Sequence, residues 1–181
     1  MNTYISILRG INVGGQRMIK MDALRQLYAS LGFENISTYI QSGNVIFLSK
    51  PEKVEVLAGV IAKKIAETFG FDVPTIVIEK ADYQEMISKN PFLAEITKDP
   101  AHLHITFLSE TPIQENVDKI AISQYLPDEF RMIGKVVYLY CPNSYSNSKL
   151  TNSFFESKLK VTATTRNWKT TQELMSIAEK N

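Results

Sequence analysis

The order of elements predicted between residues 4 and 78 recurs between residues 103 and 165, and this repeat restricts the fold more than any other feature. Runs rich in β-branched and aromatic residues predict strands, and apolar residues at helical spacing predict helices. The first half has a strand at 4–8, a helix at 21–31, hairpin strands at 37–41 and 44–48, a helix at 54–69 and a strand at 73–78. The second has a strand at 103–108, a helix at 117–122, hairpin strands at 129–133 and 136–141, a helix at 150–159 and a strand at 161–165, before a terminal helix at 170–179.

Each half therefore has the β-α-β-β-α-β order of a ferredoxin-like unit, an α+β fold with a mainly antiparallel sheet. Two helices cover one face of such a sheet and leave the other bare. Pairing two units would bury both bare faces and supply a core that roughly 80 residues alone form with difficulty. We expect an internal duplication, with a first unit at 1–80, a linker with a short helix at 81–100, and a second unit with a C-terminal helix at 101–181.

Charge and composition exclude several classes of function. The chain has 20 basic and 19 acidic residues, and a net charge of +1 disfavours a nucleic-acid partner. The single cysteine, Cys141, excludes an intrachain disulfide and a cysteine-rich zinc site. No apolar run approaches the roughly 18 residues of a membrane span, and residues 1–9 do not resemble a signal peptide. We expect a cytoplasmic protein with no membrane partner, no metal and no organic cofactor.

A glycine-rich loop lies between the first strand and the first helix, where many folds bind phosphate. Its glycines allow backbone amides to converge on an anion, whose charge basic side chains would neutralise. The residues concerned are Arg9, Gly10, Asn12, Gly14, Gly15, Arg17 and Lys20. The loop matches neither the dinucleotide-binding fingerprint nor the phosphate loop of nucleoside triphosphatases. A tight turn with positive φ, in which Asn12 bonds its own backbone, is the alternative.

Gln41, Ser42, Gly43 and Asn44 form the predicted tip of the first hairpin. Turn chemistry alone explains small and polar residues at such a tip. In the functional interpretation, the Gln41 and Asn44 amides face the same cleft as the glycine loop. Amides suit recognition of a base edge or a carbonyl, because each offers both a donor and an acceptor.

The segment at 164–168 places a cation, an amide and the only tryptophan at the end of a strand. Arg166 could hold a phosphate while the indole of Trp168 stacks on a ring. The alternative is that Trp168 anchors the last helix to the core and Arg166 is solvated.

Two further patterns have simpler structural explanations. Tyr138 and Tyr140 alternate along a strand as in the aromatic platform of RNA-recognition sheets, but the matching strand of the first half lacks this pattern, and such aromatics usually belong to a core. His102 and His104 lie two positions apart on a predicted strand face, and no third metal ligand accompanies them in the sequence.

Three stretches together resemble the bacterial domain-of-unknown-function family numbered 1697: Leu-Arg-Gly-Ile-Asn-Val-Gly-Gly at 8–15, Tyr-Ile-Gln-Ser-Gly-Asn-Val at 39–45, and Thr-Thr-Arg-Asn-Trp at 164–168. A segment with Lys149 and Asn152 before two phenylalanines is similar to a fourth family segment. The resemblance runs nearly end to end. It implies a duplicated pair of ferredoxin-like units and no assigned activity. Residues 144–148 depart from the family pattern, which there often has a glycine and a basic residue.

From these patterns we expect a site for a phosphorylated or otherwise anionic small molecule, such as a nucleotide, shared by the glycine loop, the first hairpin tip and the 164–168 segment. Its residues would be Arg9, Gly10, Asn12, Gly14, Gly15, Lys20, Gln41, Ser42, Asn44, Lys149, Asn152, Arg166, Asn167 and Trp168. The alternatives are an enzyme without a cofactor, which uses Arg166 or Lys149 to stabilise negative charge, an RNA- or single-strand-binding module, and a protein-interaction scaffold.

Overall fold

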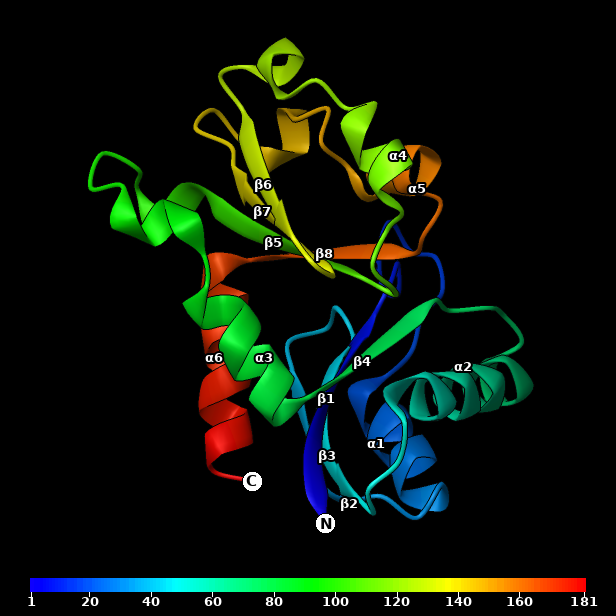
Figure 1. Cartoon of the computed structure of the whole chain (residues 1–181). Helices are drawn as coiled ribbons and strands as arrows, with labels where there is room; N and C mark the ends of the chain where they lie inside the picture. The colour runs from blue at the N-terminus through cyan, green and yellow to red at the C-terminus, as the bar shows by residue number, and fades with distance from the viewer. The chain divides into compact units, whose positions relative to one another are not determined.

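The computed structural model describes all residues, Met1–Asn181. The chain divides into two compact units (Figure 1): unit 1 comprises Met1–Glu85 and Glu173–Asn181, and unit 2 comprises Met86–Gln172. Each unit contains one four-stranded antiparallel sheet. No helix has the length and apolar character required to cross a membrane.

Unit 1 has the strand order β2-β3-β1-β4. Its elements are β1 (Asn2–Leu8), α1 (Met21–Ser30), β2 (Glu34–Tyr39), β3 (Asn44–Ser49), α2 (Val54–Phe69) and β4 (Thr75–Glu79). Apolar residues of α1 and α2 share one core cluster with Tyr4 and Leu8 of β1 and with Val45 and Phe47 of β3. Both helices therefore cover the same face of the sheet, as the β-α-β-β-α-β order predicts.

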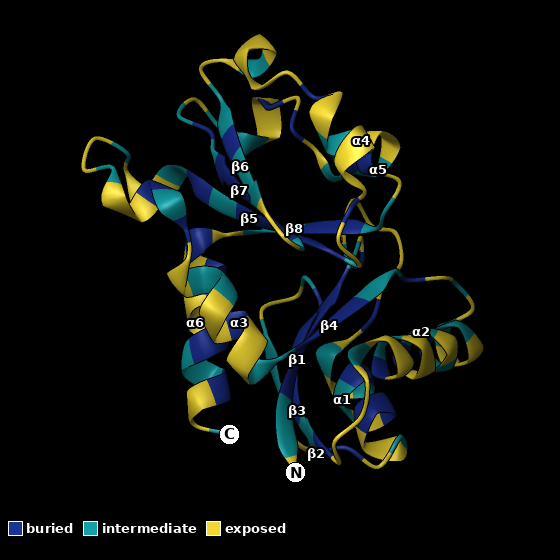
Figure 2. Cartoon of the chain, viewed as in Figure 1, coloured by how far each residue is buried: buried dark blue, intermediate teal, exposed yellow.

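Aromatic side chains form the centre of the unit 1 core. Tyr4 and Phe47 are register partners on β1 and β3, and their ring centroids lie 5.7 Å apart. Tyr28 of α1 and Phe33 reach the Phe47 ring at 5.4 and 4.5 Å. The Tyr28 and Ser6 hydroxyls lie 2.6 Å apart, so both buried polar groups are satisfied. Burial raises the pKa of Tyr28. β1 and β3 are accordingly buried over most of their length (Figure 2).

Unit 2 repeats this topology with the strand order β6-β7-β5-β8. Its elements are β5 (Leu103–Leu108), α4 (Gln114–Asp118), β6 (Glu129–Ile133), β7 (Val136–Tyr140), α5 (Asn152–Leu159) and β8 (Ala163–Asn167). Leu139, Phe130 and Phe155 belong to its core cluster. Two further helices, α3 (Lys80–Ser88) and α6 (Trp168–Glu179), include residues of both units. The predicted fold class, two tandem β-α-β-β-α-β units with a C-terminal helix, is confirmed.

The first helix of unit 2 ends earlier in the chain than predicted. In place of a helix at 117–122, α4 ends at Asp118 and a 3-10 turn, η3 (Ile122–Tyr125), follows. Val117 and Ile120 are the apolar side chains of residues 114–121 that join the core cluster. Burial of two side chains supports little more than one helical turn, because most helical stability comes from the packed face.

The last strand of unit 2 begins two residues later than predicted. Lys160 ends α5 in the left-handed conformation, with φ at 60°, so residues 161 and 162 complete the turn into the sheet. This shift places Arg166 and Asn167 inside β8 and starts α6 at Trp168.

The tip of the first hairpin packs directly against the end of β1. The Leu8 amide donates to the Gly43 carbonyl at 2.8 Å. A Cβ atom at Gly43 would lie 2.7 Å from the Leu8 Cβ and 2.9 Å from the Ile11 Cδ1, and Gly43 has a φ of 80°. Both the close approach and the backbone conformation therefore require glycine.

A half-buried charge cluster joins the segment after α3 to the sheet of unit 2. The Lys98 ammonium donates to Glu129 on β6 and lies 4.3 Å from the centroid of the Tyr140 ring. The guanidinium of Arg131 lies 5.0 Å from the centroid of the Phe92 ring. The hydrogen bond between Lys98 and Glu129 raises the pKa of Lys98 and lowers that of Glu129. These contacts attach residues 91–98 to the sheet face that carries Tyr140.

We predict that Gly43→Ala lowers the free energy of unfolding by about 2 kcal/mol, because the added methyl group meets Leu8 and the φ is strained. Gly59→Ala is the matched control. Gly59 lies in α2 with no atom within 4 Å of the place that a methyl group would take, and we expect this substitution to stabilise by about 0.5–1 kcal/mol. Urea unfolding followed by far-UV circular dichroism measures both. Equal effects of the two substitutions would contradict the packing at the hairpin tip.

We predict that Glu129→Gln lowers the free energy of unfolding at pH 7 by about 2 kcal/mol, since it removes the nearer of the two carboxylates that pair with Lys98 and leaves Glu95 at 3.4 Å. The folded-state pKa of Glu129 is below its ordinary value of 4.5. The stability that the Glu129 carboxylate contributes is therefore present above pH 4.5 and is lost as the pH falls through the folded-state pKa. The difference between wild type and variant should therefore shrink in acid.

Urea unfolding between pH 7 and pH 3 checks this expectation. Glu115→Gln is the control, because Glu115 forms an exposed pair with Lys119 at 3.1 Å, which should be worth less than about 1 kcal/mol. A difference for Glu129→Gln that is independent of pH would show that the charge pair is not its cause.

Candidate functional site

The glycine-rich loop of unit 1 is a closed turn held by the side chain of Asn12. The Asn12 amide donates to the Ile19 carbonyl at 3.0 Å and to the Gln41 carbonyl at 2.8 Å, while its oxygen accepts from the Ile19 amide at 2.8 Å. Asn12 itself has a φ of 55°. Both amide hydrogens are thus used inside the protein, so the Asn12 side chain shapes the loop and has no further N–H to offer a ligand.

The remaining glycines of the loop serve its conformation. Gly14 and Gly15 are exposed, have φ values of 59° and 73°, and connect Val13 to Gln16 in a tight turn whose Gln16 amide donates to the Val13 carbonyl. Gly10 has a φ of 71°. These observations favour the turn that the sequence offered as the alternative to a phosphate cradle.

Arg9, which precedes the loop, is half-buried, and its backbone amide donates to the Pro74 carbonyl at 2.9 Å.

The first hairpin tip is joined to this loop by the bond from Asn12 to Gln41. The fully buried Asn44 donates to the Tyr39 carbonyl at 3.1 Å and to the Ser42 hydroxyl at 2.9 Å, so it stabilises the tip from within. Gln41 is exposed, and its side chain lines a pocket. Of the predicted tip residues, Gln41 lines this pocket.

An open pocket of about 500 Å³ lies between the start of α1 and the hairpin tip. Its lining comprises Lys20, Met21, Asp22, Arg25, Thr38, Ile40 and Gln41. The Arg25 guanidinium donates to both Asp22 and Thr38, which fixes its position. Lys20 is the N-cap residue of α1 and makes no side-chain capping bond there. The pocket thus combines two cations, one carboxylate, one amide and uncapped helix amides.

In unit 2 the predicted residues around 164–168 divide between the two faces of the sheet. Thr165 pairs with Thr106 across the sheet, and its hydroxyl lies 2.7 Å from that of Thr106 and 2.7 Å from the Asn152 Oδ1. Arg166 follows Thr165 in the strand and pairs with Ile105, so it belongs to the opposite face. The structure therefore does not bring Arg166 and Asn152 together on one side of β8.

Asn167 and Trp168 start the terminal helix. The Asn167 Oδ1 accepts from the Thr170 amide at 2.8 Å, and its carbonyl accepts from the Thr171 hydroxyl at 2.9 Å. Trp168 is 7% exposed. Asn167 is thus a helix cap, and the burial of Trp168 favours an anchoring role over stacking on a ligand.

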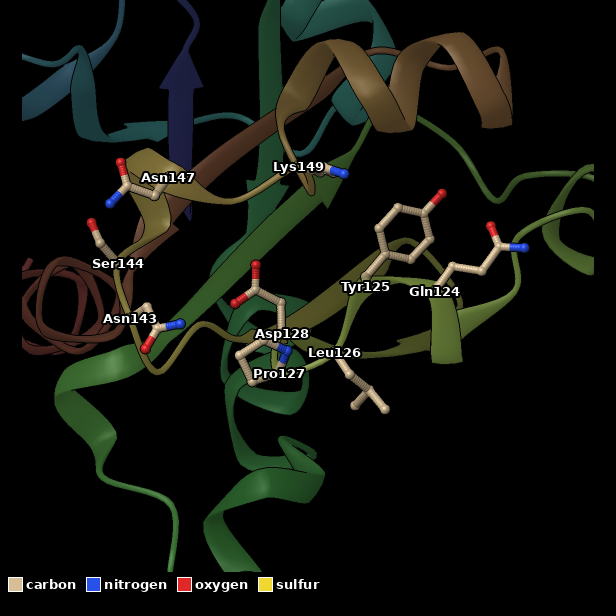
Figure 3. A pocket seen from close by; sticks show the side chains of 9 residues that line it. All are labelled: Gln124, Tyr125, Leu126, Pro127, Asp128, Asn143, Ser144, Asn147 and Lys149. Atoms are coloured by element: carbon tan, nitrogen blue, oxygen red, sulfur yellow. The ribbon is translucent and has the colours of Figure 1, made fainter.

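Lys149 lines a second pocket, of about 200 Å³, that lies wholly in unit 2 (Figure 3). One side is formed by the loop after β7, with Asn143, Ser144 and Asn147, and the other by the segment before β6, with Tyr125 and Asp128. The complete lining is Gln124, Tyr125, Leu126, Pro127, Asp128, Asn143, Ser144, Asn147 and Lys149.

The tyrosine and histidine pairs have structural environments. Tyr138 is buried, and its hydroxyl donates to the Met86 carbonyl at 2.6 Å. Tyr140 lies beneath Lys98, so neither ring forms an open stacking platform. His104 stacks on Tyr145 at 4.6 Å, and burial lowers its pKa. His102 belongs to a 3-10 turn (Pro100–His102) before β5 rather than to the strand. No three side chains of His, Cys, Asp or Glu are grouped to hold a metal ion.

Several pocket residues were not predicted from the sequence. Arg25 lies four positions after Met21, so helical spacing could have placed it beside the start of α1. Asp128 follows Pro127 and lines the pocket of unit 2. A Pro-Asp pair is a turn signal, which predicts a loop but does not identify the residues that share a pocket with Asp128. Thr38 and Asn143 carry no local signal of this kind.

The fold has a counterpart among solved structures. The chain is similar to the conserved bacterial protein SP0830 from Streptococcus pneumoniae, with a TM-score of 0.75 and 23% sequence identity over 98% of each chain. At that identity the likeness shows the fold. No curated protein matches the chain.

The sequence profile of the family described as "Protein of unknown function (DUF1697)" matches residues 1–138. The matched part contains the glycine loop and the first hairpin tip, and it ends before Lys149 and residues 164–168. The match spans more than half of the chain. The protein is therefore a member of the DUF1697 family.

Proposed function

We propose that unit 1 binds a small phosphorylated or otherwise anionic molecule in the pocket at the start of α1. The observation that carries the proposal is the lining of this pocket, where the unpaired ammonium of Lys20 and the uncapped first turn of α1 lie together with Arg25 and Gln41. The site is built from unit 1 alone.

The start of α1 supplies backbone donors for an anion. The first amides of a helix have no partner within the helix, and their dipoles favour negative charge. Lys20 at the N-cap position makes no side-chain bond to these amides, whereas a serine or aspartate there would accept from one of them. A bound phosphate or carboxylate would take the place of that capping oxygen.

The side chains around the helix start supply charge and selectivity. Arg25 uses two of its donors on Asp22 and Thr38, which leaves further N–H groups on a guanidinium already held in place. The Asp22 carboxylate offsets one of the two positive charges, which belong to Lys20 and Arg25. The pocket therefore favours a ligand that carries only a small negative charge. Gln41 offers a donor and an acceptor to the uncharged part of a ligand.

We predict that inorganic phosphate, adenosine monophosphate or a sugar phosphate raises the melting temperature of the protein, because a ligand that binds only the folded state stabilises it. For the probe that binds most tightly, Lys20→Gln should weaken the affinity about 10-fold, the effect of losing one charge-assisted hydrogen bond. Added salt should weaken binding in the wild type. Thermal shift and isothermal titration calorimetry measure these effects.

Lys53→Gln is the matched control. Lys53 is the N-cap residue of α2, has nearly the same backbone angles as Lys20 and also makes no side-chain capping bond. We expect its affinity for the probe to equal that of the wild type. Failure of all three probes to raise the melting temperature, or equal losses in the two variants, would overturn the proposal. Release of phosphate from a bound ester during the titration would identify an enzyme rather than a binding protein.

We also propose a cytoplasmic location for the protein. The single cysteine supports it, since Cys141 is free and buried and the chain has no second thiol for a disulfide.

A further inference from the structure

The pocket of unit 2 is held open by two well-packed walls. On one side, Tyr145 stacks on His104 at 4.6 Å and so anchors the loop that carries Ser144 and Asn147. On the other, the ring of Tyr125 packs edge-on against Phe154 at 5.1 Å. Packing of this kind limits rearrangement of a pocket, and a pocket that is already formed loses less entropy when a ligand binds.

Backbone hydrogen bonds complete both walls. The Asp128 amide donates to the Tyr125 carbonyl at 2.9 Å and closes the turn through Leu126 and Pro127. In the opposite loop, the Ser148 amide donates to the Tyr145 carbonyl at 3.0 Å. The polar side chains that face the pocket are thus carried by ordered turns.

Two opposite charges line this pocket without forming an ion pair. Neither the Asp128 carboxylate nor the Lys149 ammonium has a salt-bridge partner or a side-chain hydrogen bond, with each other or with another residue. Asp128 is half-buried, and Lys149 is exposed. In Figure 3 the two charged groups occupy separate points around the space, with uncharged amide and hydroxyl groups beside them.

We propose that this pocket binds a small zwitterion of the free α-amino acid class, whose ammonium pairs with Asp128 and whose carboxylate pairs with Lys149. A ligand that carries both charges satisfies both side chains at once. A simple anion would leave Asp128 unpaired and would be repelled by its carboxylate. A simple cation would leave Lys149 unpaired and would be repelled by its ammonium. This site is separate from the anion pocket proposed in unit 1.

The size and chemistry of the pocket agree with such a ligand. A volume of about 200 Å³ is below the roughly 300–1,000 Å³ of pockets for drug-sized ligands, and a free amino acid is correspondingly small. Asn143, Asn147 and Gln124 offer amides to a polar ligand side chain, and Tyr125 offers an aromatic surface.

The proposal can be tested by isothermal titration calorimetry with the free L-amino acids. The tightest binder is then compared with its N-acetyl derivative, which lacks the ammonium charge, and with its amide, which lacks the carboxylate. We expect each blocked form to bind about 10-fold more weakly than the free amino acid, since each loses one charge-assisted contact.

Two variants assign the charges. Asp128→Asn should weaken the free amino acid about 10-fold and leave the N-acetyl form unchanged, because that form has no ammonium to lose. Lys149→Gln should weaken the free amino acid and leave the amide form unchanged. Lys158→Gln, on the exposed surface of α5, should bind like the wild type.

Circular dichroism shows that each variant is folded before it is titrated. Absence of binding by every amino acid would overturn the proposal, as would blocked forms that bind as tightly as free ones. An equal loss for free and blocked forms in both pocket variants would also overturn it, since it would show a general effect on the pocket rather than recognition of two charges.

Discussion

Each sheet buries one face beneath two helices, and the positions of all other parts of a unit follow from this burial. Side chains along a strand alternate between faces, so Tyr4 and Phe47 meet α1 and α2 in only one register. A slip by one residue would turn this apolar set away from the helices. Unit 2 obeys the same rule with Leu139 and Phe155. Once the register is set, the positions of the loops at the strand ends follow, and both pockets include residues of such loops.

Most of the polar residues that distinguish the sequence serve the backbone. Asn12 closes the glycine loop, Asn44 holds the hairpin tip and Asn167 caps α6. An amide whose donors already bond carbonyl groups inside the protein has little left for a ligand. In the two proposed sites, charged groups without an ion-pair partner remain for a ligand, namely Lys20 in unit 1 and Asp128 and Lys149 in unit 2.

The two units share a topology but place their pockets differently. In unit 1 the pocket lies between the start of α1 and the β2–β3 tip, while in unit 2 it lies between the segment before β6 and the loop after β7. Loops tolerate change far better than the strands they connect, because they contribute less to the core. Duplication of one fold has thus produced two pockets with different charge: excess positive in the first, balanced in the second.

Local patterns in the sequence were enough to give the order and type of the elements, since hydrophobic periodicity and turn residues such as Gly43 and Gly134 act over a few positions. They also identified Lys20, Gln41 and Lys149, three residues that line pockets. The partners of these residues became known from the fold alone. Strand register placed Arg166 and Thr165 on opposite faces of one sheet, and packing brought Asp128 into the same pocket as Lys149. Such pairings depend on how distant segments meet in space, and no local pattern of residues encodes that meeting.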